Sequence, residues 1–484
     1  MDQENNNTNY DRYKEYGYSE DVLPVKPADR DWGIMKFVTL WMGAVHNIMG
    51  YMTVAGFFVL GMNVPQVLWA VMISAVIVSI LYALNGYASS KYGLPFSMLL
   101  RDTFGVKGAL IPTLARGLIA GLVFFGTTTV VGAEALNIIF TRIYPDYLSL
   151  GGNFNFFGLD LPTMISYIIL WIVTVTLFMG GRGVLDKFGS LSSPVVYVFI
   201  IGAAVWAINM AGGWGPVMAY TPATTMASPI VFIAAVSALV SNWAGPIVNI
   251  GDFTQRARKP KDAMIGLPLG MIISYVLFAI TTVALIAGTE IAFGEPIFNI
   301  AYAIDKMDSN LAVIVLILAL NVGATAFVVF ANLLPAGLQL TALFPKVFTV
   351  KTGGIFTAIL GTLIFPWKLV ADTSTLYLFY GFIGSLFGPI LGIMLSSFYL
   401  NRNKHIKLDN IYVKSGENGE YANGYNMLAI GILIFSFVVT MSGAFLQSIP
   451  LLVNLNNFAF FSGLIISFIL YSVLNGMMRK ENKE

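Results

Sequence analysis

An all-α membrane protein with about twelve transmembrane helices is the fold class that this sequence predicts. Of the 484 residues, 57% are hydrophobic and only 11% are charged, whereas a soluble domain keeps about a quarter of its residues charged. Apolar runs long enough to cross a hydrocarbon core recur from Phe37 to Leu474. The predicted spans cover residues 37–60, 67–84, 113–140, 163–180, 194–211, 228–250, 264–288, 311–331, 354–370, 376–398, 427–447 and 457–475.

The positions of the basic residues give these spans a direction. With the N-terminus in the cytoplasm, all but four of the 27 lysines and arginines fall in cytoplasmic segments. The exceptions are Arg116, Arg142, Lys306 and Lys368. Because cytoplasmic loops of membrane proteins are enriched in basic residues, we expect a multi-pass protein of the cytoplasmic cell membrane with both termini in the cytoplasm.

One membrane domain, residues 37–475, is expected between two polar cytoplasmic tails, residues 1–36 and 476–484. The asparagine-rich first ten residues are too polar to pack, so we expect them to be mobile. The absence of cysteine excludes disulfides, thiolate metal sites and cysteine catalysis. The net charge of +2 gives no indication of nucleic-acid binding, and no cofactor is expected.

Two of the predicted spans carry residues that interrupt a helix. Span one contains His46-Asn47-Ile48-Met49-Gly50, and span six contains Ser241-Asn242-Trp243-Ala244-Gly245-Pro246 followed by Asn249. They are the first spans of two blocks of five, residues 37–211 and 228–398. Irregular backbone at this depth is tolerated where it lines a cavity, and matched interruptions in two halves indicate the central site of a carrier. Helices that are merely kinked for close packing are the alternative.

Several polar side chains are expected at membrane depth, where they face a partner or a cavity. They supply neutral donors and acceptors with few fixed charges, which suits an uncharged polar ring better than a zwitterion or a phosphate. Trp243 offers such a ring a stacking face. Hydrogen bonding between helices is the alternative role for each polar residue. The set is His46, Asn47, Glu134, Asn242, Asn249 and Asn332.

At these residues the chain resembles the nucleobase:cation symporter-1 family, and most of all its bacterial allantoin and hydantoin permeases, over about residues 20–475. The resemblance implies a five-plus-five inverted-repeat bundle with two additional C-terminal helices and alternating access to a mid-membrane site. The matching stretches are RDWG (30–33), LWMGAVHNIMGY (40–51), ALNGYASSKYGLPFSMLLRDTFG (83–105), NWAGPIVNIGDFT (242–254), AFGEP (292–296), ANLLPAGLQLTALFPK (331–346) and PWKL (366–369).

The resemblance also implies roles for single residues in substrate binding. Trp243 matches the tryptophan that stacks on the substrate, and Asn242 takes the neighbouring contact position. Asn332 matches an asparagine that hydrogen-bonds the substrate, and Asn47 falls where the family has a polar contact to the ring.

Span three and the end of span six depart from the family pattern. Phe124 and Thr128 stand where relatives have a stacking tryptophan and a ligand-binding glutamine, and Thr128 is too short to replace the amide. Ring recognition is therefore expected to be kept while the identity of the substrate is not transferable. Asp252 and Arg256, in a variant of the family's DFTR motif, are expected to act in gating or structure, with a solvated loop as the alternative.

The sodium site of sodium-coupled relatives is degenerate here. Its carbonyl positions correspond to Gly43, His46 and Gly323, but Ala326 and Phe327 stand at the two hydroxyl positions. A hard cation needs several oxygen ligands, so we expect a proton to be the coupling ion and no metal to be bound.

His46 is the first candidate proton carrier because imidazole titrates near neutral pH, and the carboxyl group of Glu134 is the second. Either residue could instead have a structural role, and uniport stays open.

These observations predict a permease that imports a small, planar, neutral heterocycle such as a nucleobase, hydantoin or allantoin. A carrier of a vitamin such as thiamine or pyridoxine, a uniporter and a channel are the alternatives. A membrane enzyme would need converging catalytic groups or a metal set, which one histidine and one glutamate at membrane depth do not supply. The expected partners are the heterocycle, the coupling cation and the lipid bilayer.

Overall fold

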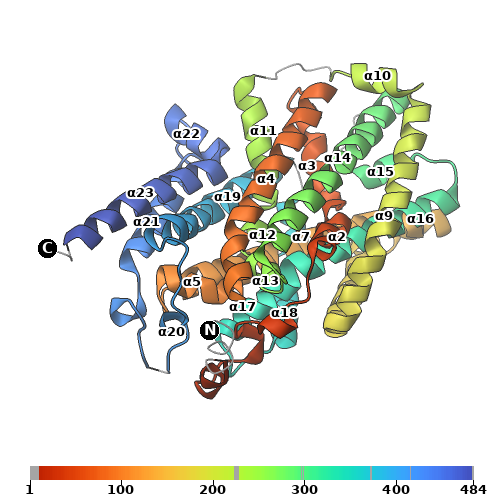
Figure 1. Cartoon of the computed structure of the whole chain (residues 1–484). Helices are drawn as coiled ribbons and strands as arrows, with labels where there is room; N and C mark the ends of the chain where they lie inside the picture. Colours follow the sequence, from red (N-terminus) through yellow and green to blue (C-terminus); the bar gives the residue numbers. More distant parts are fainter. Residues whose placement is uncertain are drawn as a thin grey trace.

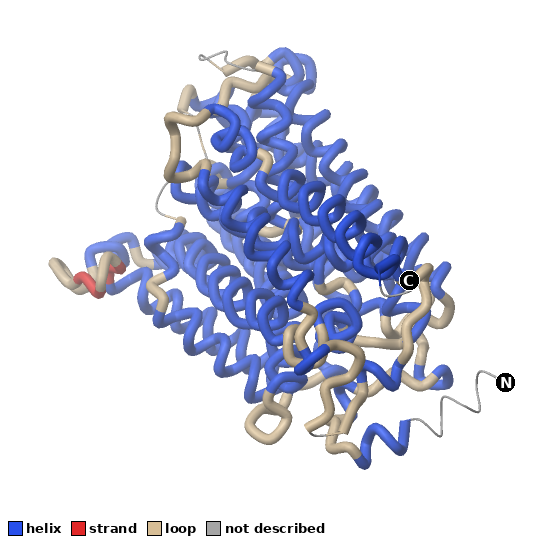
Figure 2. The backbone as a smooth tube through the Cα atoms, turned by 90° about the vertical axis from the view of Figure 1, so that its left-hand side faces the viewer, coloured by secondary structure: helices blue, strands red, loops and turns tan. Residues whose placement is uncertain are grey.

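The computed structural model of the chain is a bundle of long helices (Figures 1 and 2). It describes residues 10–222, 228–295, 297, 299–370, 373–414 and 416–481. Positions 1–9, for which the sequence predicts mobility, lie outside the described residues, as does Pro296 of the AFGEP stretch.

Nine helices of the described chain are long and apolar enough to cross a membrane, and one bent pair gives a tenth span. Two shorter apolar helices, α11 (Pro229–Asn242) and α18 (Val350–Leu363), lie at predicted spans six and nine. The bent pair is α2 (Ile34–Val45) with α3 (Ile48–Val59). The nine are α4 (Val64–Tyr92), α6 (Leu110–Leu114) continued by η3 (Ala115–Ala120) and α7 (Gly121–Ile143), α8 (Leu161–Met179), α9 (Arg182–Met210), α14 (Pro260–Phe293), α16 (Asn310–Val328) continued by η5 (Val329–Leu333) and α17 (Leu334–Leu343), α19 (Thr373–Leu395) continued by η7 (Ser396–Asn401), α21 (Met427–Ser442) and α23 (Ala459–Glu481).

Each predicted span therefore coincides with a helix, but several boundaries differ. The helix of span five begins at Arg182 instead of residue 194, because hydropathy marks the apolar part of a helix and not its polar extension. Span nine was predicted to reach residue 370, whereas α18 ends at Leu363. Phe365 there has a φ of +52° and is followed by Pro366, which has no N–H and disfavours helix at the preceding residue. PWKL forms the short helix η6 (Pro366–Leu369).

The first spans of the two blocks meet inside the bundle. Helix α3 contacts α11, α4 packs against both α11 and α14, and α7 packs against α16. Helices α21 and α23 pack mainly against α19, with smaller contacts from α23 to α11 and from α21 to α5 (Phe96–Phe104), and they lie together at one side of the molecule (Figure 1). The two five-span blocks thus form the body, and the last two spans are an addition to it.

The N-terminal segment from Tyr10 onward is packed against the bundle. The ring of Tyr13 stacks on Tyr412 with 4.5 Å between centroids, and the Tyr412 hydroxyl donates to the carbonyl of Val22 over 2.6 Å. Trp32 forms a parallel β-bridge with Ala257, at the end of span six. The N-terminal segment therefore contacts two other segments that are predicted to be cytoplasmic, the loop between spans ten and eleven and the end of span six.

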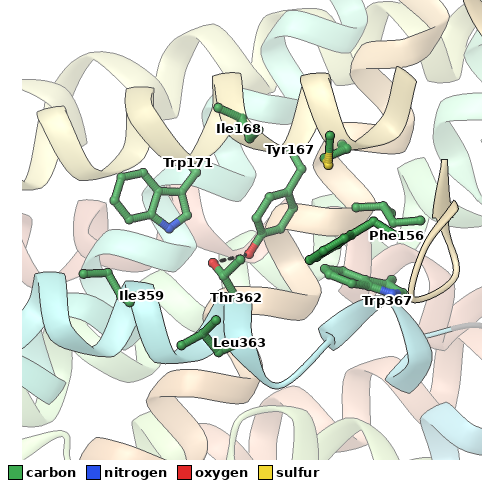
Figure 3. A pocket seen from close by; sticks show the side chains of 10 residues that line it. Phe156, Tyr167, Ile168, Trp171, Ile359, Thr362, Leu363 and Trp367 are labelled. Atoms are coloured by element: carbon green, nitrogen blue, oxygen red, sulfur yellow. Dashed lines mark hydrogen bonds between the residues drawn. The ribbon is translucent and has the colours of Figure 1, made fainter. Parts of the chain in front are cut away.

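A hairpin of two short strands, β1 (Asn155–Phe156) and β2 (Leu159–Asp160), precedes α8. It borders an apolar groove of about 320 Å³ between α8 and α18 (Figure 3). The Tyr167 hydroxyl hydrogen-bonds Thr362 across this groove over 2.9 Å, and Trp367 Nε1 donates to the carbonyl of Phe157 over 3.0 Å. The groove is lined by none of the residues predicted to bind substrate.

The remaining short elements lie before, within or between the spans. They are η1 (Glu20–Val22), η2 (Pro27–Asp29), α5 (Phe96–Phe104), η4 (Pro145–Ser149), α10 (Trp214–Ala219), α12 (Ala244–Val248), α13 (Gly251–Thr254), α15 (Ile300–Asp305), α20 (Leu408–Ile411), η8 (Ala422–Gly424) and α22 (Pro450–Asn457).

The predicted orientation can be tested at the two ends of α18, where Lys351 and Lys368 are both exposed. Because the chain has no cysteine, single variants Lys351→Cys and Lys368→Cys each introduce one thiol. In intact cells a membrane-impermeant maleimide should label Lys368→Cys, and it should label Lys351→Cys only after permeabilisation. The reverse pattern would mean that the orientation read from the basic residues is wrong.

Candidate functional site

Span one is interrupted at the predicted residues. Helix α2 ends at Val45 and α3 begins at Ile48, and the two are bent by 66°. Asn47 occupies the gap in extended conformation, where its Oδ1 accepts the N–H of Gly50 over 2.9 Å and its Nδ2 donates to the carbonyl of Val45 over 3.3 Å. The Asn47 side chain thus satisfies backbone groups that the break exposes.

Span six is interrupted as well. Helix α11 ends at Asn242, and Trp243 and Asn249 have non-helical dihedral angles on either side of α12. The carbonyls of Ile247 and Val248 both accept from Asn85 Nδ2, over 2.8 and 2.7 Å. Asn85 of α4 was not predicted to belong to the site, although an amide inside a long apolar run is a signal that could have identified it.

The two predicted stacking residues lie on either side of a third ring. Trp243 is buried, with ring centroids of Trp41 at 5.5 Å, Phe327 at 5.9 Å and Tyr275 at 6.2 Å. Phe124 lies 6.3 Å from the same Phe327 ring. The structure therefore brings Trp243 and Phe124 into one aromatic cluster, with the Phe327 side chain between them.

Three of the predicted binding residues carry a buried polar atom with no hydrogen-bond partner in the part of the chain that the structure describes. These atoms are Thr128 Oγ1, Asn242 Nδ2 and Asn332 Nδ2, and each residue is only 1% exposed. The other amide atom of Asn242 accepts from the Tyr380 hydroxyl over 3.2 Å. Leaving such an atom unpaired costs about 1–3 kcal/mol, so a group of three on spans three, six and eight indicates a place for a polar ligand or water.

At the positions that correspond to the sodium site, backbone groups of spans one and eight come close together. Gly323 lies so close to span one that a Cβ at this position would be 2.5 Å from the carbonyl oxygen of His46 and 3.4 Å from that of Gly43. The carbonyl oxygens of His46 and Gly43 therefore both lie close to Gly323. Ala326 and Phe327 supply no hydroxyl, and the Phe327 ring extends toward Trp243 and Phe124.

The two predicted proton carriers occupy different places. His46 is buried, its Nδ1 lies 2.6 Å from the Tyr51 hydroxyl, and that hydroxyl lies 3.4 Å from Thr281 Oγ1. The imidazole packs edge-on against Tyr197 of α9 at 4.5 Å. Glu134 is half-buried on α7, about 15 Å along the helix from Phe124 at 1.5 Å per residue, so it is not part of the aromatic cluster.

Asp252 is the centre of a hydrogen-bond network below Trp243, in the direction of the predicted cytoplasmic side. Its Oδ1 accepts the N–H of Phe96 over 2.9 Å, and its Oδ2 accepts from Asn249 Nδ2 over 2.9 Å and from Gln339 Nε2 over 3.4 Å. Arg116 joins the network by donating from Nε to Asn249 Oδ1 over 3.0 Å. Sequence reasoning missed Gln339, and it noted Arg116 only as a charge inside a span.

Arg256 is placed differently from Asp252. Its carbonyl accepts the N–H of Trp32 over 3.0 Å, and its half-buried side chain forms no ion pair with Asp252 among the described residues. Both residues line the same small pocket at the inner end of span six, and their expected role in gating or structure stays a prediction.

Comparison with known proteins gives concordant matches over nearly the whole chain. The family described as permease for cytosine/purines, uracil, thiamine, allantoin matches residues 24–464. A protein of Escherichia coli (strain K12) named as a candidate allantoin permease is 36% identical over 465 residues, which are 96% of this chain and 95% of that protein. The allantoin permease of Bacillus subtilis (strain 168) is 31% identical over 458 residues, 94% of this chain and 92% of that protein.

A solved structure has the same fold. It is that of MHP1, a nucleobase-cation-symport-1 family transporter in a closed conformation with bromovinylhydantoin bound, and it aligns with a TM-score of 0.78 at 24% identity over 96% of each chain. This likeness confirms the predicted fold class, an all-α membrane bundle of the transporter type. The chain is a transporter and not an enzyme, and it belongs to the family of permeases for cytosine/purines, uracil, thiamine and allantoin, the nucleobase:cation symporter-1 family.

Proposed function

We propose that this permease imports a small, planar, uncharged heterocycle of the allantoin, hydantoin or nucleobase type by proton symport, alternating between outward and inward access. The observation that carries the proposal is that the three spans that form the aromatic cluster also carry three buried polar atoms with no partner in the described part of the chain. The allantoin permease of Bacillus subtilis, 31% identical to this chain, supports a cargo of this class.

The chemistry of the cluster suits a flat ring with polar edges. Trp243 provides an aromatic face, which adds about 0.5–1.5 kcal/mol to a stacked contact beyond the area that it buries. The Nδ2 atoms of Asn242 and Asn332 are donors for ring carbonyls, and the hydroxyl of Thr128 can donate or accept. All three groups are neutral, so a neutral cargo leaves no buried charge without a counter-charge.

Phe124 and Phe327 limit the size of the ring that fits beside Trp243. Phe327 presents its edge to Trp243, with an interplanar angle of 80°. A cargo ring that stacks on Trp243 must share the space with this phenylalanine, which favours a single small ring. The side-chain amide of Asn47 already bonds the backbone at the break in span one. In this proposal Asn47 therefore supports the cargo site by holding that backbone in place.

Alternating access follows from the two interrupted spans. Discontinuous helices in both halves of a transporter meet at the central site, and the halves move relative to each other around it. In this proposal the membrane domain spans residues 37–475 of a cytoplasmic-membrane protein, and Asp252 closes the inner end of the site through Asn249, Gln339 and the N–H of Phe96.

The local chemistry favours a proton over sodium as the coupling ion. The converging carbonyls of Gly43 and His46 lack the hydroxyl ligands that positions 326 and 327 would have to supply. His46 carries a titratable group at the same break and is connected to Thr281 through the Tyr51 hydroxyl. Glu134 is the second candidate, at a greater distance from the cluster.

Ligand binding should depend on Trp243 and Asn332. In a thermal-shift screen of purified protein against allantoin, hydantoin, uracil, cytosine, thiamine and pyridoxine, at least one ring compound should raise the melting temperature, since a ligand at 100 times its Kd adds about 2.7 kcal/mol of stability. Trp243→Ala and Asn332→Ala should both abolish the shift. Trp69→Ala is the matched control, because Trp69 is 65% exposed on α4, and it should respond like the wild type. A full response in both site variants would show that the site is misplaced.

Transport should follow the proton gradient. In reconstituted vesicles a proton-motive force of 100 mV provides about 2.3 kcal/mol per proton, enough for roughly fiftyfold accumulation of a neutral solute. An imposed sodium gradient should give no accumulation, and His46→Gln should still equilibrate the solute without concentrating it. Accumulation driven by sodium alone would refute proton coupling, and equilibration without any accumulation in the wild type would establish uniport.

A further inference from the structure

Arg116 is a charged side chain at 0% exposure inside a transmembrane helix. It lies in η3, a π-helical turn within span three, and π-helical turns are frequent at functional sites. A charge buried in a membrane span is costly unless it is paired and hydrogen-bonded. The partners of this guanidinium therefore indicate why it is kept there.

Its hydrogen bonds connect the two other spans that carry the candidate site. Nε donates to Asn249 Oδ1 in span six over 3.0 Å, and Nη2 donates to the carbonyl of Ala331 in span eight. Gly245 of span six lies directly on the guanidinium, since a Cβ at that position would be 3.2 Å from Nε and 3.3 Å from Cζ. Asp252, bonded to Asn249, brings the compensating negative charge into the same network.

The carbonyl of Ala331 cannot form the usual α-helical hydrogen bond because of a proline. In an α-helix it would accept the N–H of the residue four positions later, but that residue is Pro335, which has no N–H. The helix widens into the π-helical turn η5 over Val329–Leu333 just before this proline. Asn332, whose Nδ2 has no partner in the described part of the chain, is the next residue in that turn.

We propose that Arg116 is the positioning residue of the cargo site: it holds the π-helical turn that carries Asn332 and the inner end of broken span six at a fixed separation. This inference rests on the proposed function, in which Asn332 binds the cargo. The planar guanidinium suits the task because Nε and Nη2 donate in a rigid geometry toward two different helices. A neutral amide such as Asn85 satisfies two carbonyls of one segment, whereas Arg116 joins two segments.

A double-mutant cycle on the full-length protein tests whether Arg116 acts through Asn332. The variants are Arg116→Met, Asn332→Ala and the double variant, with allantoin and hydantoin as probes. Kd is measured by titration calorimetry at ligand concentrations well above those of the thermal-shift screen, where the weakened binding of Asn332→Ala is still measurable. Arg116→Met should weaken binding by roughly tenfold or more, as expected when a hydrogen bond from a charged group is lost. In the Asn332→Ala background the same change should weaken binding no further, because coupled residues are not additive. Independent, additive losses would overturn the proposal.

Two variants separate positioning from general stability. Arg116→Lys keeps the positive charge but loses the planar guanidinium that donates to two helices at once. This variant should fold, and its affinity should lie between those of Arg116→Met and the wild type. Should Arg116→Met fail to fold, the cycle is run with Arg116→Lys. Arg142→Met removes an arginine that bonds Asp305 and Asn310 between outer loops, and it should lower the melting temperature without changing Kd. An unchanged Kd in both Arg116 variants would overturn the proposal.

A second measurement needs no ligand and distinguishes this inference from the proposed function. Because the chain has no cysteine, the variant Asn332→Cys carries a single thiol, whose alkylation rate reports its orientation and access. Combining it with Arg116→Met should change that rate several-fold while the protein stays folded, and an unchanged rate would refute the positioning role. If the wild type binds neither probe but the rate changes, the assigned cargo is wrong and the positioning role of Arg116 stands.

Discussion

Backbone hydrogen bonding inside the membrane is the constraint on which this structure depends. A carbonyl or N–H group that faces hydrocarbon without a partner costs several kcal/mol, yet spans one, six and eight all interrupt their own helical ladders. Each interruption is compensated by a side chain. Asn47 bonds both ends of the break in span one, Asn85 bonds two carbonyls of span six, and Arg116 bonds the carbonyl in span eight whose α-helical donor is replaced by Pro335.

This compensation makes a polar site possible in an apolar bundle. Once the backbone of the breaks is satisfied, Thr128, Asn242 and Asn332 keep polar atoms that have no partner in the described part of the chain. These residues lie on the same three spans as the rings of Phe124, Trp243 and Phe327. Two neighbouring positions on span eight have different contacts. Gly323 admits the carbonyls of span one at close range, whereas Phe327, one turn further, fills space beside Trp243. A sequence change at positions 326 and 327 therefore affects both the positions that correspond to the sodium site and the aromatic cluster.

The network around Asp252 connects this central region to the predicted cytoplasmic face. It joins spans three, six and eight and the backbone at Phe96, and span six continues from there to the β-bridge between Trp32 and Ala257. The N-terminal segment that carries Trp32 also contacts the loop between spans ten and eleven through Tyr13 and Tyr412. A movement of the inner end of span six would thus be transmitted to both polar segments.

The sequence by itself determined the spans, their interruptions and the family. Hydropathy is a local property, so twenty-residue apolar runs locate helices, and Asn, Gly and Pro within them locate the breaks at His46–Asn47 and Trp243. Hydropathy does not detect the polar extension of a helix beyond its apolar part. For this reason α9 begins at Arg182, earlier than the predicted start of span five.

Only the tertiary structure decided which side chains meet. Asn85 and Ile247 are separated by 162 positions, Arg116 and Asn249 by 133, and Arg116 and Ala331 by 215. Their hydrogen bonds depend on the rotation of each helix about its axis and on the packing of its neighbours, and neither quantity is encoded in a local pattern. For the same reason no local pattern indicated that Asp252 is connected to Arg116 through Asn249.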